Sequence, residues 1–126
     1  MTRSSPDQPA VRVFTEAEKR ELHGSTFREL VLDGADFSDA VLQGATFDQV
    51  SLRGCDFRRA DLRGAAILGC DLSGARFDEV LLGGNRFHGS SFAEVAGLTE
   101  EQEGYVCRRG GTFVVQGGGP RLRLLR

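Results

Sequence analysis

The chain has 126 residues, of which 40% are hydrophobic and 27% are charged, and its 18 acidic and 16 basic side chains leave a formal net charge of −2. These values are close to the globular average, and they favour neither disorder nor a strongly charged protein that binds nucleic acid. No stretch reaches the roughly 20 apolar residues of a membrane span, and the polar start MTRSSPDQPA lacks the apolar core of a signal peptide, so we expect a cytoplasmic protein.

Residues 1–19 are predicted to form an N-terminal tail that ends in a short capping helix. Thr15 and Glu18 have the spacing of a capping box, in which each side chain bonds the backbone N–H of the other residue. Val13 or Phe14 is then able to pack on the first part of the element that follows.

A repeat of five residues runs without a gap from about Arg20 to Glu94, and we assign residues 20–96 to it. A period of five fits neither an α-helix nor a β-strand. The residue two places before each centre is usually small, as at Ala35, Cys55 and Cys70. The fifteen centres, which we expect to form the core, are all Leu, Phe or Ile: Leu22, Phe27, Leu32, Phe37, Leu42, Phe47, Leu52, Phe57, Leu62, Ile67, Leu72, Phe77, Leu82, Phe87 and Phe92.

Centres of the same type recur every twenty residues, which predicts an all-β solenoid whose square coils have four five-residue sides. About three to four coils would stack at the ~4.8 Å spacing of adjacent strands. Glycine ends many leucine repeats, where a corner requires backbone angles that β-branched residues avoid. The predicted sides are the columns Leu22, Leu42, Leu62, Leu82; Phe27, Phe47, Ile67, Phe87; Leu32, Leu52, Leu72, Phe92; and Phe37, Phe57, Phe77.

The repeats ADFSD, CDFRR, ADLRG and CDLSG resemble the A(D/N)Lxx motif of the pentapeptide-repeat family. The resemblance covers about three-fifths of the chain and implies a right-handed quadrilateral β-helix. It implies little about function, because only a minority of members has a known activity. Some members resemble B-form DNA in size and negative surface, and they bind DNA gyrase to protect it from quinolones or natural topoisomerase poisons.

Residues 97–126 are predicted to form a C-terminal capping helix and a basic, Gly-rich tail. Thr99 and Gln102 make a second capping box, which places a helix at about residues 99–105. Residues 112–116 (TFVVQ) are a candidate strand, and residues 117–120 a flexible connector. The final RLRLLR has three readings: a strand that adds to an edge, a partner-binding tail, or a disordered segment.

Candidate catalytic and ligand-binding groups are few, and we predict no enzyme, no metal and no cofactor. His23 and His88 fall on different sides near opposite ends of the solenoid, so they cannot share a metal. Cys55 and Cys70 occupy inward positions on different sides, which predicts inert, unbridged thiols. Cys107 is the one cysteine expected to react, and the phosphate-loop pattern GxxxxGK is absent.

The fourth side, centred on Phe37, Phe57 and Phe77, is predicted to carry a ladder of charges with opposite signs facing each other across neighbouring coils. The ladder has two readings: pairs that each stabilise the stack by roughly 0.2 to 1 kcal/mol, or a docking surface for a partner. Its columns are Asp39, Arg59, Glu79; Asp36, Asp56, Arg76; and Ser38, Arg58, Asp78. The candidate interaction surface is Asp36, Asp39, Asp56, Arg58, Arg59, Arg76, Asp78 and Glu79.

We interpret the chain as a non-catalytic protein-interaction or scaffold module that displays side chains at fixed spacing. The partner would be a protein of unknown identity, without direct contact to nucleic acid or membrane, and a homodimer through an end cap or the tail is open. The alternative, implied by the resemblance, is a DNA-mimicking protein that binds and protects gyrase. Exposed apolar residues that could form a small interface with the tail are Val31, Val41, Leu68 and Leu81.

Overall fold

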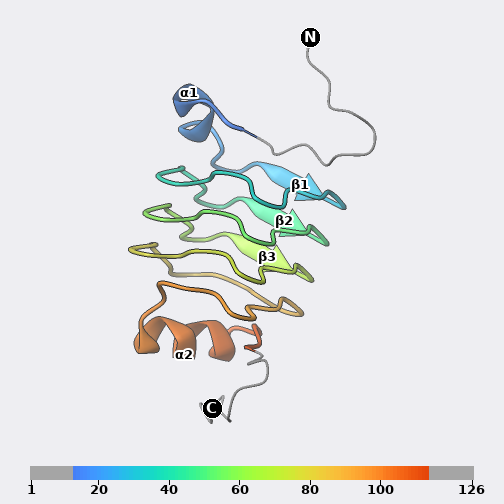
Figure 1. The fold of residues 1–126 in the computed structure, drawn as a ribbon, viewed down its shortest axis with the longest axis vertical. Coiled ribbons are helices and arrows are strands. Elements are labelled where there is room, and N and C mark those ends of the chain that lie inside the picture. The colour runs from blue at the N-terminus through green and yellow to red at the C-terminus, as the bar shows by residue number, and fades with distance from the viewer. Residues whose placement is uncertain (1–12, 114–126) are drawn as a thin grey trace.

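Residues 13–113 are described by a computed structural model, in which the chain winds into stacked coils that form a β-helix between two short α-helices (Figure 1). Helix α1 spans Glu16–Lys19 and helix α2 spans Glu100–Arg108. The strands β1 (Thr26–Arg28), β2 (Thr46–Asp48) and β3 (Ala66–Leu68) form one parallel sheet in the order β1-β2-β3. Most of the remaining coil residues lie in turns and single bridges, because each side is too short for a longer strand.

The register between coils is twenty residues throughout the stack. Phe27 pairs with Phe47, and Phe47 pairs with Ile67 in parallel strands. Isolated parallel bridges repeat this interval outside the sheet, as between Asp36 and Asp56. The predicted twenty-residue columns are therefore confirmed. Backbone N–H groups of each coil donate to carbonyl oxygens of its neighbours, so the hydrogen bonds run along the stack.

A tight, hydrogen-bonded turn closes most of the five-residue repeats. The N–H of Ala35, for example, donates to the carbonyl oxygen of Leu32 at 3.0 Å, and the third residue of that turn, Gly34, has a φ of 76°. Positive φ at this position is the requirement of a type II turn. Glycine was predicted at such corners in the leucine repeats, but six corners in the phenylalanine repeats carry side chains in the same conformation: Glu29, Asp39, Gln49, Arg59, Glu79 and Glu94.

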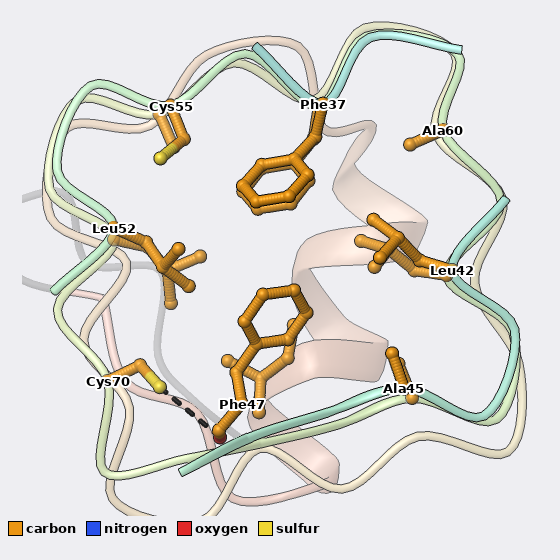
Figure 2. Close-up of a cluster of buried hydrophobic side chains, with 14 of the residues drawn as sticks. Phe37, Leu42, Ala45, Phe47, Leu52, Cys55, Ala60 and Cys70 are labelled. Atoms are coloured by element: carbon orange, nitrogen blue, oxygen red, sulfur yellow. Dashed lines mark hydrogen bonds between the residues drawn. The ribbon is translucent and has the colours of Figure 1, made fainter. Parts of the chain in front are cut away.

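The interior of the β-helix is filled by the predicted centres. Figure 2 shows Phe37, Leu42, Phe47 and Leu52 pointing inward from four directions. Thirteen of the fifteen centres are buried, and the other two, Phe27 and Leu82, are partly buried and pack against this core. From Ala35 onward the small residues two places before the centres are also buried, as the repeat predicts, whereas Ser25 on the first coil is half-buried.

Two polar side chains are buried at the small-residue position. Asn85 donates from Nδ2 to the carbonyl oxygens of Leu62 (2.7 Å) and Ala65 (2.9 Å), and Ser90 donates from Oγ to Ile67 at 2.7 Å. These bonds satisfy polar groups whose burial would otherwise be unfavourable.

The exposure of three larger apolar residues, Leu30, Val41 and Leu68, differs from the prediction. Leu30 was predicted at an inward position but is 44% exposed, because the described chain has no coil before it on that side. Val31 and Leu81 are exposed as predicted, whereas Val41 and Leu68 are only half-buried. Val41 lies against the end of α1, where its N–H donates to the carbonyl oxygen of Lys19.

Both predicted capping boxes are present at the helix N-termini. Thr15 and Glu18 bond reciprocally at α1, and Thr99 and Gln102 do so at α2. Of the two apolar residues before α1, Phe14 packs on the ring of Phe37 at 5.0 Å between centroids, and Val13 is exposed.

Helix α2 continues to Arg108, three residues beyond its predicted end, because its later residues contact the last coil. Val106 is fully buried, and the Tyr105 hydroxyl accepts a hydrogen bond of 2.8 Å from the N–H of Asn85. Thr112 then bridges Ser91, whereas residues 114–116 of the predicted strand and the predicted tail lie outside the described residues. Neither helix in residues 13–113 has the length and apolar character that a membrane span requires.

Candidate interaction surface

The coil geometry places three of every five residues on the outside, and on the fourth side nearly all of these positions are charged. We call the eight predicted residues on this side the fourth-side ladder: Asp36, Asp39, Asp56, Arg58, Arg59, Arg76, Asp78 and Glu79. Parallel bridges join Asp36 to Asp56 and Asp56 to Arg76, so this predicted column is present in the structure.

One ion pair of the ladder joins neighbouring coils as predicted. Arg59 donates from Nε and Nη2 to the two carboxylate oxygens of Asp39, at 2.9 Å each. The hydrogen bond from Arg59 holds the pKa of Asp39 below its ordinary value. Both side chains are about half exposed, so this pair contributes little to stability, although its bidentate geometry fixes both side chains.

Two other pairs form within a single coil, so the prediction that opposite signs meet mainly across coils is wrong for them. Arg58 donates to both carboxylate oxygens of Asp56, at 2.9 and 2.8 Å, and Arg76 lies 3.6 Å from Asp78. The residues before and after a centre lie on the same outer surface, which brings their side chains together. The hydrogen bond from Arg58 lowers the pKa of Asp56.

The aspartate before each centre also has a local structural role. Asp56 accepts a hydrogen bond of 3.0 Å from the backbone N–H of Arg58. Asp36 and Asp71 accept the same bond from the N–H two residues later. Such bonds stabilise turns and explain the preference for Asp at this position of the repeat.

Lys19, the only lysine of the chain, extends the ladder onto α1 and was not anticipated from the sequence. Its side chain is 4% exposed, and Nζ lies 3.2 Å from Asp36 Oδ1 and 3.2 Å from Ser38 Oγ. Burial raises the pKa of Asp36, but hydrogen bonds from Ser38 and Lys19 outweigh this effect and leave the pKa below its ordinary value. The signal for this contact in the sequence was a basic residue in the predicted capping helix, because that helix leads directly into an acidic first coil.

The end of the ladder nearest α2 is the least neutralised. Asp78 Oδ1 is buried next to Gly97 and accepts no hydrogen bond from any described residue. Glu79 is exposed. The hydrogen bond that Arg59 donates to Asp39 is the main cause of the raised pKa of Arg59, and the charge of Glu79 makes a smaller contribution in the same direction.

The remaining candidate groups do not assemble into a reactive site. His23 and His88 are exposed, and residues 13–113 contain no group of three His, Cys, Asp or Glu side chains arranged to hold a metal. Cys55 and Cys70 are buried on different sides of the coil (Figure 2). Burial raises the pKa of Cys55 to about 12 and also raises the pKa of Cys70, which disfavours the reactive thiolate and agrees with the prediction of inert thiols. Cys107 is half-buried in α2.

Among residues 13–113, a shallow hollow lies at each end of the stack. One, of about 320 Å³, is lined by Phe14, Leu22 and the acidic residues of the α1 region. The other, of about 240 Å³, lies between Leu82 and α2. Neither brings together an acid, a base and a nucleophile.

Comparison with known proteins identifies a repeat family and distant structural relatives. The chain matches the family model for pentapeptide repeats in eight copies, over residues 21–59, 41–78 and 55–95. No curated protein matches it.

Several solved structures are similar to the chain. A trypsin-treated variant of QnrB1, a plasmid-mediated fluoroquinolone resistance protein, is 25% identical with a TM-score of 0.47. The match covers 69% of this chain and 48% of that one, so the chain spans about half of that protein. AT2G44920, a pentapeptide repeat protein from the thylakoid lumen of Arabidopsis thaliana, is 24% identical with a TM-score of 0.29, over 76% of this chain and 81% of that one. Full-length QnrB1 is 18% identical with a TM-score of 0.31, over 70% and 62%.

Proposed function

The chain belongs to the pentapeptide-repeat family, and from this premise we propose that it is a non-catalytic module that presents a rigid β-helix surface to a protein partner. The observation that carries the proposal is the filled interior. Centres such as Leu42, Phe47, Leu52 and Phe57 are fully buried, so the coils enclose side chains and leave the functional groups outside. The hydrogen-bonded stack holds these outer groups in rows at fixed spacing.

We further propose that the coils are four-sided and right-handed and that α1 and α2 act as caps. The contacts of Phe14 with Phe37, and the burial of Val106, support a capping role. The organisation is then an N-terminal tail and cap (1–19), a β-solenoid (20–96), and a C-terminal cap and tail (97–126). Two buried, unbridged thiols are in keeping with a reducing, cytoplasmic location.

The fourth-side ladder is the docking surface that we propose. Its charges are paired in fixed geometry, as in the bidentate bonds of Arg58 to Asp56 and of Arg59 to Asp39. A surface of this kind selects a partner that carries both positive and negative charges in a matching arrangement. A partner with charges of one sign would meet like charges in every column of the ladder.

Site-specific crosslinking tests this proposal. A photoreactive amino acid at Arg76, which is an exposed ladder position, should give one discrete covalent adduct in cells that naturally express the protein. The matched control is Leu81, which is exposed at the same position of the next repeat but on another side. Adducts of equal yield from both positions, or adducts from Leu81 alone, would show that the ladder is not the docking surface.

The same pairing argues against the alternative of DNA mimicry. A DNA mimic requires a continuous acidic stripe, whereas Arg58 and Arg59 interrupt the acidic residues of this side. The scaffold function is therefore the one that the described surface favours.

A further inference from the structure

A second polar surface lies at the C-terminal end of the stack, and it differs from the ladder because the four residues that define it are all basic. It consists of Arg86 and His88 on the last coil and Arg108 and Arg109 at the end of α2, all exposed. We call these four residues the C-terminal basic cluster.

Contacts between the backbone segments bring the four residues to the same end of the stack. The N–H of Phe87 donates to the carbonyl oxygen of Arg109 at 2.9 Å, which places Arg109 beside the Arg86–His88 segment. A Cβ added to Gly110 would lie 2.9 Å from His88 Cα, so the chain after α2 touches the last coil. The Arg109 guanidinium lies over the ring of Tyr105 at 5.6 Å, an arrangement that holds its charge in place.

The arginines of this cluster form no ion pair within the part of the molecule that the structure describes. Six other arginines (Arg28, Arg53, Arg58, Arg59, Arg63 and Arg76) each lie within 4.0 Å of an aspartate oxygen. Within residues 13–113, Arg86, Arg108 and Arg109 have no such partner. Among the described residues, the nearest acidic side chain that shares a lining with the cluster is Glu101, which lies with Arg108 around the hollow between Leu82 and α2 and forms no ion pair with it.

Helix electrostatics account for only half of the cluster. Arg108 and Arg109 compensate the negative end of the α2 dipole. Arg86 and His88 lie on a coil with no helix of their own, so the dipole gives no reason for them to be basic. Like charges held together without counter-charges are unfavourable until an anionic partner binds.

We propose that the C-terminal basic cluster binds an acidic, Asp/Glu-rich segment of a partner protein. Guanidinium groups bind carboxylates through paired hydrogen bonds, and the carboxylates on one face of an extended segment recur about every 7 Å. Nucleic acid is the less suitable anion, because it requires many phosphate contacts along a basic surface. This chain has a net charge of −2, and Glu100 and Glu101 at the start of α2 limit the extent of the positive surface.

Fluorescence anisotropy with a labelled oligo-glutamate peptide tests the proposal on the full chain. We expect saturable binding at low ionic strength that weakens as salt is added. The double variant Arg86→Glu/Arg109→Glu should weaken binding by about tenfold or more, and Arg86→Glu alone, which leaves α2 intact, should have part of that effect. The control Arg20→Glu/Arg28→Glu changes the net charge equally at the opposite end of the stack and should leave binding within about twofold.

Three results would overturn the proposal: no saturable binding by the wild-type chain, equal weakening in the control variant, or tighter binding to a DNA oligonucleotide than to the peptide. The third result would assign the cluster to nucleic acid. Thermal melting of each variant separates loss of binding from loss of fold. Because the cluster lies outside the fourth-side ladder, the result is independent of the crosslinking experiment at Arg76.

Discussion

The ring of Phe57 stacks on the ring of Phe37, with their centroids 5.1 Å apart and their planes 5° from parallel. On its other face Phe57 stacks on Phe77 in the same way, at 5.3 Å. The Phe57 ring therefore fills the space between two others, and removing it leaves a gap that its neighbours cannot close without breaking the backbone register between coils.

Phe57→Ala should lower the free energy of unfolding by ~3 to 5 kcal/mol, through lost burial and the cavity that remains. Chemical denaturation measures this cost directly. Phe27→Ala is the control, because Phe27 is only half-buried on the first coil and should cost clearly less. A fall in the melting temperature of only a degree or two for Phe57→Ala would contradict the stacked core.

Gly44→Ala should lower the free energy of unfolding by about 1 to 2 kcal/mol because an L-residue is strained in the left-handed conformation. Gly44 has a φ of 70°, and a Cβ there would meet nothing within 4 Å, so the backbone strain is isolated from any clash. Gly44→Asn should recover part of the loss, since Asn tolerates this conformation better. Gly83→Ala is the control and should be close to neutral, because Gly83 does not have a positive φ. Equal costs at both positions would refute the explanation by backbone strain.

Asp61 gives a pH-dependent contribution to stability. Hydrogen bonds from Arg63 lower the pKa of Asp61 to about 2, from an ordinary value of 3.8. The folded state therefore binds this proton less tightly than the unfolded state, so the stabilisation is present above about pH 4 and is lost as the pH falls through about 2.

An Arg63→Met substitution should raise the pKa of Asp61 toward its ordinary value, which NMR titration of the carboxylate can measure. It should also reduce the dependence of unfolding free energy on pH between about 4 and 2. Other lowered carboxylates, such as Asp56, should keep a residual dependence in this variant. An unchanged Asp61 titration in the variant would show that Arg63 is not the cause.

The purified protein should neither inhibit gyrase supercoiling nor relieve a gyrase poison at micromolar concentration. Arg58 and Arg59 bond directly to ladder carboxylates, so a basic DNA-binding groove would meet only a weak negative potential. Inhibition that rises with dose, weakens with salt, and disappears on replacing Asp36 and Asp56 with Asn would contradict this expectation. Such a result would promote the DNA-mimic function over the scaffold.

The charge pairing of the ladder shows where prediction from the sequence was incomplete. The twenty-residue interval correctly aligned Asp39 with Arg59, but it could not indicate that Arg58 bonds within its own coil to Asp56. A long side chain such as that of arginine can reach several carboxylates at similar free energy, and the local turn geometry determines which of them it binds. The burial of Lys19 also depended on where α1 settles, which no repeat specifies.

The sequence by itself determined the β-helix, the twenty-residue register, the buried centres and both helix starts. Each of these features follows from a local sequence pattern. The five-residue pattern recurs so often that only a coil of twenty residues buries Leu42, Phe57 and the other centres together. Only the tertiary structure shows that Leu30 is exposed at the first coil, that α2 continues to Arg108, and that the backbone of Arg109 lies beside the segment that carries Arg86. These features depend on how the segments at the two ends of the stack pack against it. The repeat gives every inner coil the same neighbours, but it does not specify the neighbours of the first and last coils.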